Sequence, residues 1–130
     1  MELGGDNGDR SLGKVYKDGE EIICEGEEGN CMFVIQEGEV EVIIAGDEEQ
    51  EIRLGVRKEG EFFGEMAIFD RDVRSATVRA LGDARVLTVD KKNFMRRVHE
   101  DPSLAFRLVE TMSRRIRELG EEVARLKSAQ

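Results

Sequence analysis

The sequence is poor in the residues that most often perform catalysis or bind metals. Its 130 residues include one histidine, His99, together with two cysteines, one proline and no tryptophan. A metal centre or a nucleophilic site needs several such groups at defined spacings, so we expect no metal, no cofactor and no enzymatic activity. Cys24 and Cys31 have no CxxC spacing. A redox or metal pair is one interpretation of them, but we favour two ordinary small apolar residues in a reducing compartment.

Long apolar runs and an excess of positive charge are absent as well. No run of apolar residues is long enough to span a membrane, and no signal-peptide pattern is present. We therefore expect a cytoplasmic protein without a membrane partner. Aspartate and glutamate (29) outnumber lysine and arginine (20), which gives a formal net charge of −9. A partner held by phosphate neutralisation requires a basic patch, so this acidity argues against a nucleic-acid polymer.

The part of the chain that follows residue 12 has the pattern of a β protein. Short segments rich in β-branched residues alternate with glycine-containing turns, and the expected strands cover 15–16, 21–24, 32–36, 40–45, 51–56, 75–80 and 85–89. Turn signals at intervals of about 8–12 residues are typical of a sandwich or jelly roll. Apart from Gly64, we interpret the glycines as turn positions that need a positive φ, including Glu28-Gly29-Asn30 and Glu37-Gly38. Residues 1–12 are too polar to bury and should form a disordered tail.

Two helices are expected after the last strand. Asp90 is a suitable N-cap for a helix over 91–99. Asp101 and Pro102 are expected to be the N-cap and the first residue of a second, longer helix. The predicted fold class is therefore mainly β with C-terminal α. It consists of one domain over 13–130, with a jelly-roll barrel over 13–89, a short cassette helix at 65–69 and the two helices over 90–130.

The longer helix carries apolar residues at spacings that alternate between three and four. They are Val109, Met112, Ile116, Leu119, Val123 and Leu126. β-Branched residues at the a positions and Leu or Met at the d positions favour a parallel two-stranded coiled coil. We predict a homodimer through 105–126; the alternative is that this face packs on the chain's own barrel.

The stretch 62–78 carries the strongest functional signal. Gly64 precedes a short run of helix formers, and Arg74 follows a charged loop. A glycine lets the backbone approach a ligand closely, and the first N–H groups of a helix favour an anion. Arg74 offers a fork of donors to phosphate oxygens, and Glu65 could accept bonds from a hydroxyl pair. The pattern indicates a site for a phosphate and a sugar hydroxyl; the alternative is a surface ion pair between Glu65 and Arg74.

These residues also resemble a known cassette. Gly64-Glu65-Met66-Ala67 followed by Arg74-Ser75-Ala76-Thr77-Val78 is similar to the phosphate-binding cassette of the cyclic nucleotide-binding domain family, and the similarity extends over about 15–119. The resemblance implies that Glu65 binds the ribose 2′-hydroxyl, that Arg74 pairs with the cyclic phosphate, and that cassette N–H groups complete the site. The implied ligand-binding set is Phe63, Gly64, Glu65, Met66, Ala67, Arg74, Ser75, Ala76 and, near the base, Arg115.

The sequence departs from the family at two places. In some members, two polar residues after the base-proximal arginine bind adenine, and here Leu119 and Gly120 replace them. A glycine within a helix costs about 1 kcal/mol relative to alanine, which suggests a loosened or closely approached segment there. The family also usually has a helical segment before its first strand, where this chain has a glycine-rich stretch.

The resemblance implies a ligand-responsive regulatory module that acts through its C-terminal helices. In the family, Ala after the cassette arginine accompanies cyclic AMP and Thr often accompanies cyclic GMP; Ser75 is permissive, and we favour cyclic AMP. One alternative is a dimerising interaction module of the same fold with a vestigial or differently specific pocket. A cupin-type metal oxygenase would need two or three histidine ligands, and a transcription regulator would need a DNA-binding segment that this sequence does not show.

Overall fold

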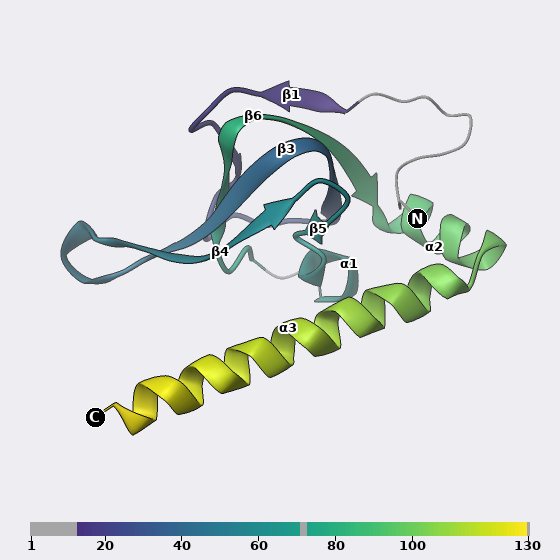
Figure 1. Ribbon diagram of the computed structural model, residues 1–130. Coiled ribbons are helices and arrows are strands. Elements are labelled where there is room, and N and C mark those ends of the chain that lie inside the picture. The colour runs from purple at the N-terminus through teal and green to yellow at the C-terminus, as the bar shows by residue number, and fades with distance from the viewer. Residues whose placement is uncertain (1–12, 71–72, 130) are drawn as a thin grey trace. The chain divides into compact units, whose positions relative to one another are not determined.

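The computed structural model describes residues 13–70 and 73–129. The predicted N-terminal tail lies outside these residues. The chain divides into two compact units, with the boundary between Phe94 and Met95. The first unit contains the β-sheet and the second contains most of the C-terminal helical region (Figure 1).

The first unit is built on one antiparallel sheet of six strands. Its path runs β1-β6-β3-β4, while β2 pairs with β6 and β5 pairs with β3. The strands are β1 (Lys14–Tyr16), β2 (Glu21–Ile23), β3 (Cys31–Ala45), β4 (Glu51–Lys58), β5 (Phe62–Phe63) and β6 (Thr77–Asp90). The predicted fold class, mainly β with C-terminal helices, is confirmed. The predicted barrel is not closed, because the path ends at β1 and β4 among the described residues.

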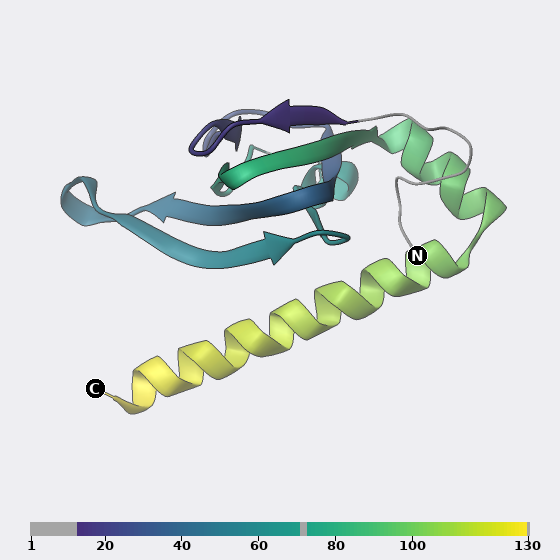
Figure 2. The same cartoon turned by 45° about the horizontal axis from the view of Figure 1, so that its top comes forward.

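Each of the long strands β3 and β6 takes the place of two shorter strands that the turn signals predict. The segments expected at 32–36 and 40–45 form the single strand β3, which continues through Gly38 at a φ of +87°. The register of β3 against β6 shifts on both sides of Glu37, as at a β-bulge. A positive-φ glycine is thus correctly expected at Gly38, but it bends the strand and does not reverse it. Figure 2 shows β3 continuing beside β4 towards the short 3₁₀ helix η1 (Asp47–Glu49).

The core of this unit lies against the inner faces of β3 and β6. Phe33 on β3 stacks on its cross-strand partner Phe63 on β5, with ring centroids 5.2 Å apart. The buried cluster around this pair consists of Ile23, Phe33, Ile35, Val40, Phe63, Val78, Ala80, Ala84 and Val86. Because Phe63 is the residue before Gly64, packing of the core fixes where the predicted cassette begins.

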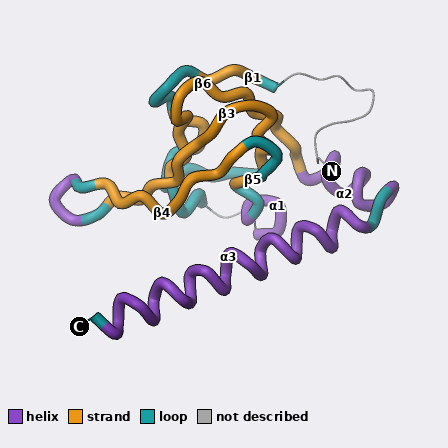
Figure 3. Tube along the Cα trace, viewed as in Figure 1, coloured by secondary structure: helices purple, strands orange, loops and turns teal. Residues whose placement is uncertain are grey.

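The helices follow the predicted order, as Figure 3 shows by colour. They are α1 (Met66–Asp70), α2 (Lys91–Glu100) and α3 (Ser103–Ser128). The predicted cap of α2 is present, since the N–H of Asn93 donates to Asp90 Oδ1 at 2.8 Å. α3 begins at Ser103, one residue later than predicted, and the Asp101 carboxylate accepts from the N–H of Ser103 at 3.2 Å.

α3 presents most of its predicted apolar seam to solvent. Leu104 and Leu108 near its start are buried, whereas Ile116 is 67% exposed. Val109, Leu119, Val123 and Leu126 are also exposed. The homodimer remains a prediction, and this exposed seam is the observation that motivates it.

The outer face of the sheet carries an ion network that joins three strands. Glu41 on β3 accepts from Arg53 on β4 at 2.8 Å and from Arg79 on β6 at 3.0 Å, and Arg79 also reaches Glu51. These hydrogen bonds, that of Arg53 first, hold the pKa of Glu41 below its ordinary value. The Glu41 side chain is only 13% exposed, so solvent screens its bonds less than those of a surface pair.

We predict that Glu41→Gln lowers the free energy of unfolding at pH 7 by about 1–2 kcal/mol. This is below the usual ~1.5–3 kcal/mol for a hydrogen bond to a charged group, because the Arg53 partner is 52% exposed and solvent screens its bond. Because the folded-state pKa of Glu41 is lowered, its contribution is present above the unfolded-state pKa and is lost as pH falls through the folded-state value. The difference between wild type and variant should therefore shrink below about pH 4. Urea denaturation from pH 7 to pH 3 measures this, with the exposed Glu59→Gln as control. A difference that stays constant with pH would contradict the prediction.

Candidate functional site

The site begins at the turn between β5 and α1. Gly64 adopts a φ of +76°, in the left-handed region that side chains other than glycine rarely occupy. A Cβ at this position would also lie 3.0 Å from Arg74 Nη1 and 3.0 Å from Ile23 Cδ1. Conformation and space therefore both require glycine here, and the backbone of the cassette lies directly against the arginine side chain.

The guanidinium of Arg74 is fixed by groups from two other segments. Its Nη1 donates to the carbonyl of Gly64 at 3.0 Å, and its Nη2 donates to the carbonyl of Cys31 at 2.9 Å. The Cζ atom lies 5.6 Å from the centroid of the Phe33 ring, within the range of a cation–π contact. Arg74 is partly buried. A cation in a fixed orientation is thus placed beside the cassette turn.

The backbone of Arg74 is held as well. Its N–H donates to the carbonyl of Glu27 at 2.6 Å, and its own carbonyl accepts from the N–H of Gly26 at 2.8 Å. An isolated antiparallel bridge joins the neighbouring residues Glu28 and Val73. The loop between β2 and β3 therefore positions Arg74, although these segments are far apart in the sequence.

The short helix α1 uses part of its hydrogen-bonding capacity internally. The sequence predicts that N–H groups of this turn bind the ligand. In this structure the N–H of Ala67 lies 3.3 Å from the carbonyl of Gly64, and the N–H of Ile68 donates to the carbonyl of Glu65 at 3.0 Å. Gly64 O thus accepts from both Arg74 and Ala67, which ties the helix to the arginine.

The other predicted site residues differ in their surroundings. Phe63 is buried in the core, Glu65 is half-buried, and Met66 is 57% exposed. Ser75 is exposed and Ala76 is half-buried, just before β6 begins. The structure thus places the eight predicted residues from Phe63 to Ala76 in one unit.

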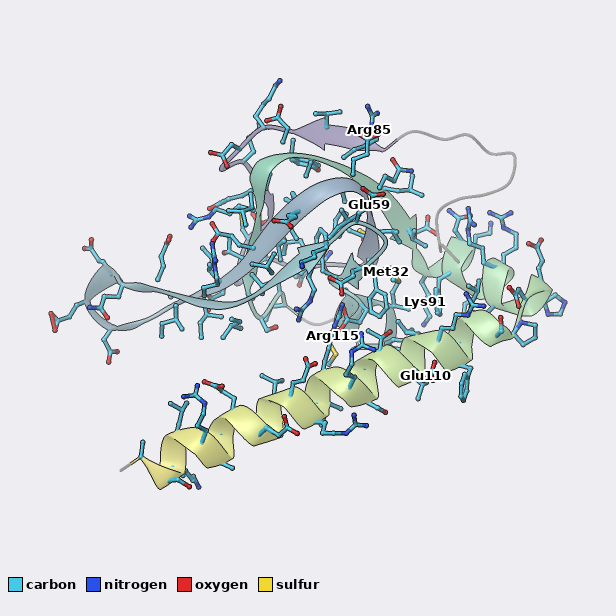
Figure 4. All side chains as sticks on the ribbon, in the orientation of Figure 1. Met32, Glu59, Arg85, Lys91, Glu110 and Arg115 are labelled. Atoms are coloured by element: carbon cyan, nitrogen blue, oxygen red, sulfur yellow. The ribbon has the colours of Figure 1, made fainter. Side chains whose placement is uncertain are left out.

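Arg115 lies on α3, in the second unit (Figure 4). Its predicted position near a base therefore remains a prediction. Gly120 lies within the unbroken helix α3, and a Cβ added there would have no described atom within 4 Å. The helix continues through the glycine, so the expected loosened segment is not observed, whereas a close approach at Gly120 remains a prediction.

Sequence reasoning missed three contributors to the site. They are the Phe33 ring, the Cys31 carbonyl and the space at Gly29. Phe33 has the pattern of an ordinary core residue, and a carbonyl carries no side-chain signal. Gly29 was expected to be a turn glycine with positive φ, but its φ lies outside the left-handed region, so that interpretation is wrong.

The cysteines do not have the surroundings of a reactive pair. Both are free. The thiol of Cys24 donates to Glu21 Oε1 at 2.8 Å, and this hydrogen bond is the main cause that raises the pKa of Cys24 to about 11. A thiol with that pKa is protonated at neutral pH and is a poor nucleophile. Within residues 13–70 and 73–129, no three His, Cys, Asp or Glu side chains are grouped as metal ligands, and no helix is long and apolar enough to cross a membrane.

The chemistry that this arrangement supports is recognition of an anion. Carbonyl oxygens orient the Arg74 guanidinium but carry no net charge, so its positive charge is not neutralised by them. The guanidinium has five N–H donors, and its bonds to Gly64 and Cys31 use only some of them. The remaining donors can bind phosphate oxygens, with the Glu65 carboxylate nearby in the sequence as an acceptor for hydroxyl groups.

Comparisons with known proteins point to one family. The family model described as "Cyclic nucleotide-binding domain" matches residues 13–101 of this chain. The cAMP-activated global transcriptional regulator CRP of Salmonella typhimurium is 32% identical over 106 residues, which cover 81% of this chain and 50% of the regulator. The chain therefore spans about half the length of such curated relatives.

Solved structures extend this similarity. The catabolite activator protein of Thermus thermophilus has a TM-score of 0.79 at 28% identity, covering 88% of this chain and 54% of that chain. The cAMP-bound form of the EAL enzyme Bd1971 is 34% identical with a TM-score of 0.62, covering 85% of this chain and 30% of that one. Its cGMP-bound form is 36% identical with a TM-score of 0.63, covering 80% and 28%.

Proposed function

The chain belongs to the cyclic nucleotide-binding domain family, as its cassette residues predict, and we propose that it binds a cyclic purine mononucleotide. Arg74 takes the cyclic phosphate, and Glu65 takes the ribose 2′-hydroxyl. The proposal is a regulatory binding module of the cytoplasm that acts without catalysis and without a cofactor.

The proposal rests mainly on the hydrogen bonds that fix the position of Arg74. Its backbone is bonded to Glu27 and Gly26, and its guanidinium is bonded to the carbonyls of Gly64 and Cys31. A side chain with this many rotatable bonds loses considerable entropy when it is fixed, and here the fold has already fixed it. An incoming phosphate therefore meets a pre-oriented cation, which reduces the ordering cost of binding.

We propose cyclic AMP as the preferred ligand. Ser75, directly after the arginine, is exposed and has a small hydroxyl side chain that is compatible with either purine. The similar regulator from Salmonella typhimurium is described as cAMP-activated. The similar EAL enzyme has been solved with each nucleotide, which is why the preference is proposed as a ratio of affinities and not as exclusion of cyclic GMP.

The response of the module is proposed to run through α3 as a dimer helix. Its seam residues expose large apolar side chains, each of whose burial is worth roughly 1.5–3 kcal/mol. A ligand shifts such a helix only if it contacts one arrangement better than another. The same seam favours the second candidate function, a dimerising interaction module with a vestigial pocket, in which dimerisation does not depend on nucleotide.

The first prediction tests the pocket. Arg74→Ala should weaken binding of cyclic AMP by about 2–5 kcal/mol, because truncating one partner of a desolvated charge pair leaves the other uncompensated. Isothermal titration calorimetry on the full chain measures this. Arg57→Ala on β4 is the matched control, since Arg57 is also half-buried and donates to a carbonyl, that of Val56. An Arg74→Ala variant within threefold of wild type would remove Arg74 from the site.

The second prediction concerns ligand choice. In a competition assay with fluorescent cyclic AMP, unlabelled cyclic AMP should displace the probe at lower concentration than cyclic GMP. Removing the hydroxyl in Ser75→Ala should weaken cyclic GMP more than cyclic AMP, because the hydroxyl can serve as an additional partner for the guanine nucleotide. A clear preference of the wild-type chain for cyclic GMP would refute the assignment.

The third prediction separates the two candidate functions. Ile116→Asp places a charge in the seam and should give a monomer in analytical ultracentrifugation, whereas Arg117→Asp, beside the seam on the same helix, should remain dimeric. If wild type dimerises but binds neither nucleotide, the interaction module is the correct function. A wild-type chain that is monomeric at high micromolar concentration would exclude dimerisation from both candidate functions.

A further inference from the structure

We propose that Gly29 is a positioning residue for Arg74: the missing side chain at Gly29 provides the space in which the guanidinium lies, and thereby sets the affinity for the nucleotide. This inference rests on the proposed function, and it adds to the site a residue from outside the cassette. Gly29 lies in the loop between β2 and β3, half-buried.

Distances show that Arg74 occupies the place of a side chain at Gly29. An ideal Cβ built on Gly29 would lie 2.1 Å from Arg74 Nε, 2.3 Å from its Cζ and 2.6 Å from its Nη2. Real Cβ atoms essentially never approach other heavy atoms this closely. The three atoms belong to the guanidinium itself, so even the smallest side chain at this position conflicts with the charged group.

Other groups also contact the guanidinium. The Phe33 ring lies with its centroid 5.6 Å from Cζ, and the carbonyls of Gly64 and Cys31 accept from Nη1 and Nη2. A sideways shift of the group would break the bonds at 3.0 and 2.9 Å. The guanidinium therefore lies in a slot, and Gly29 forms one wall of that slot.

The loop cannot easily withdraw from Arg74 to make room. Gly26 and Glu27 bond the Arg74 backbone on one side of Gly29 in the sequence, and the Cys31 carbonyl bonds its side chain on the other. Moving the loop would disrupt these contacts, whereas moving the end of a flexible side chain disrupts fewer. We therefore expect Gly29→Ala to displace the guanidinium and leave the backbone in place.

The backbone at Gly29 does not itself require glycine, because its φ lies outside the left-handed region. Alanine at a compatible φ reduces the freedom of the unfolded chain and therefore tends to raise stability. The displaced guanidinium gives up its bonds to the Gly64 and Cys31 carbonyls, and Arg74→Ala lacks the same bonds. Affinity should therefore fall, while thermal stability should fall no further than in Arg74→Ala. A merely structural role for Gly29 would lower thermal stability below that of Arg74→Ala.

The experiment compares Gly29→Ala with wild type by calorimetric titration with cyclic AMP and by thermal unfolding. We expect binding to weaken by at least about tenfold, which corresponds to about 1.4 kcal/mol, with a melting temperature no lower than that of Arg74→Ala. Gly55→Ala is the matched control, because a Cβ there would also meet an arginine, Arg57 Nη1, but at 3.2 Å and outside the site. Binding by Gly29→Ala within twofold of wild type would overturn the inference.

A double-mutant cycle tests whether Gly29 acts through Arg74. In the Arg74→Ala background the added methyl group has no guanidinium to displace, so Gly29→Ala should cause no further loss of affinity. An equal loss in both backgrounds would show that Gly29 acts by another route and would overturn the proposal.

A ligand-free measurement separates this inference from the proposed function. The Nε–H resonance of Arg74, assigned by its loss in Arg74→Ala, should shift and exchange faster with water in Gly29→Ala if the guanidinium leaves its slot. If that change occurs while wild type binds neither cyclic AMP nor cyclic GMP, the positioning stands and the proposed function fails. If wild type binds nucleotide and the resonance is unchanged by Gly29→Ala, the function stands and the positioning fails.

Discussion

The arrangement of this site depends on the pair of hydrogen bonds from the Arg74 guanidinium to the carbonyls of Gly64 and Cys31. A partly buried cation must be compensated by hydrogen bonds, or its desolvation would destabilise the fold. The two carbonyls provide that compensation and at the same time determine the direction of the remaining donors. One of them belongs to the cassette turn and the other to the first residue of β3, so the same bonds attach the cassette to the sheet.

The hydrophobic core makes this attachment rigid. Phe33 and Phe63 are cross-strand partners whose rings stack, and each is adjacent to a part of the site: Phe33 lies beneath the guanidinium, and Phe63 precedes Gly64. The aromatic pair therefore belongs to the hydrophobic core and also supports the site. Because close-packed interiors yield little, a change of volume at either ring would be transmitted to the position of Arg74. In the proposed site, recognition of the anion thus depends on the packing of β3 and β5, not only on the cassette.

The sequence allowed much of this to be predicted, and the failures have physical causes. The proximity of Gly64 and Arg74 could be predicted because a cassette is a local pattern, in which residue type and spacing carry the information. Gly29 was misinterpreted because its requirement is for space beside a residue distant in the chain, which no local pattern encodes. The long strand β3 was predicted as two strands because a positive-φ glycine is common both in turns and in bulges, and only pairing with β6 decides between them.

Neutral carbonyls as hydrogen-bond partners of Arg74 leave its positive charge available for an anion, whereas a carboxylate partner would neutralise it. A guanidinium paired with Glu65 would present no net charge, and a phosphate would have to displace the carboxylate before it could bind. With Gly64 and Cys31 as acceptors, Arg74 keeps its positive charge while its geometry is fixed. The chain as a whole carries a net charge of −9, which repels an anion at long range. Since salt screens charges over about 8 Å at physiological ionic strength, that repulsion weakens with distance from the surface, whereas contacts within the slot are screened much less. In the proposed site, an acidic protein can therefore bind an anionic ligand, because the short-range attraction of Arg74, held by two carbonyl groups, outweighs the repulsion of a screened surface charge.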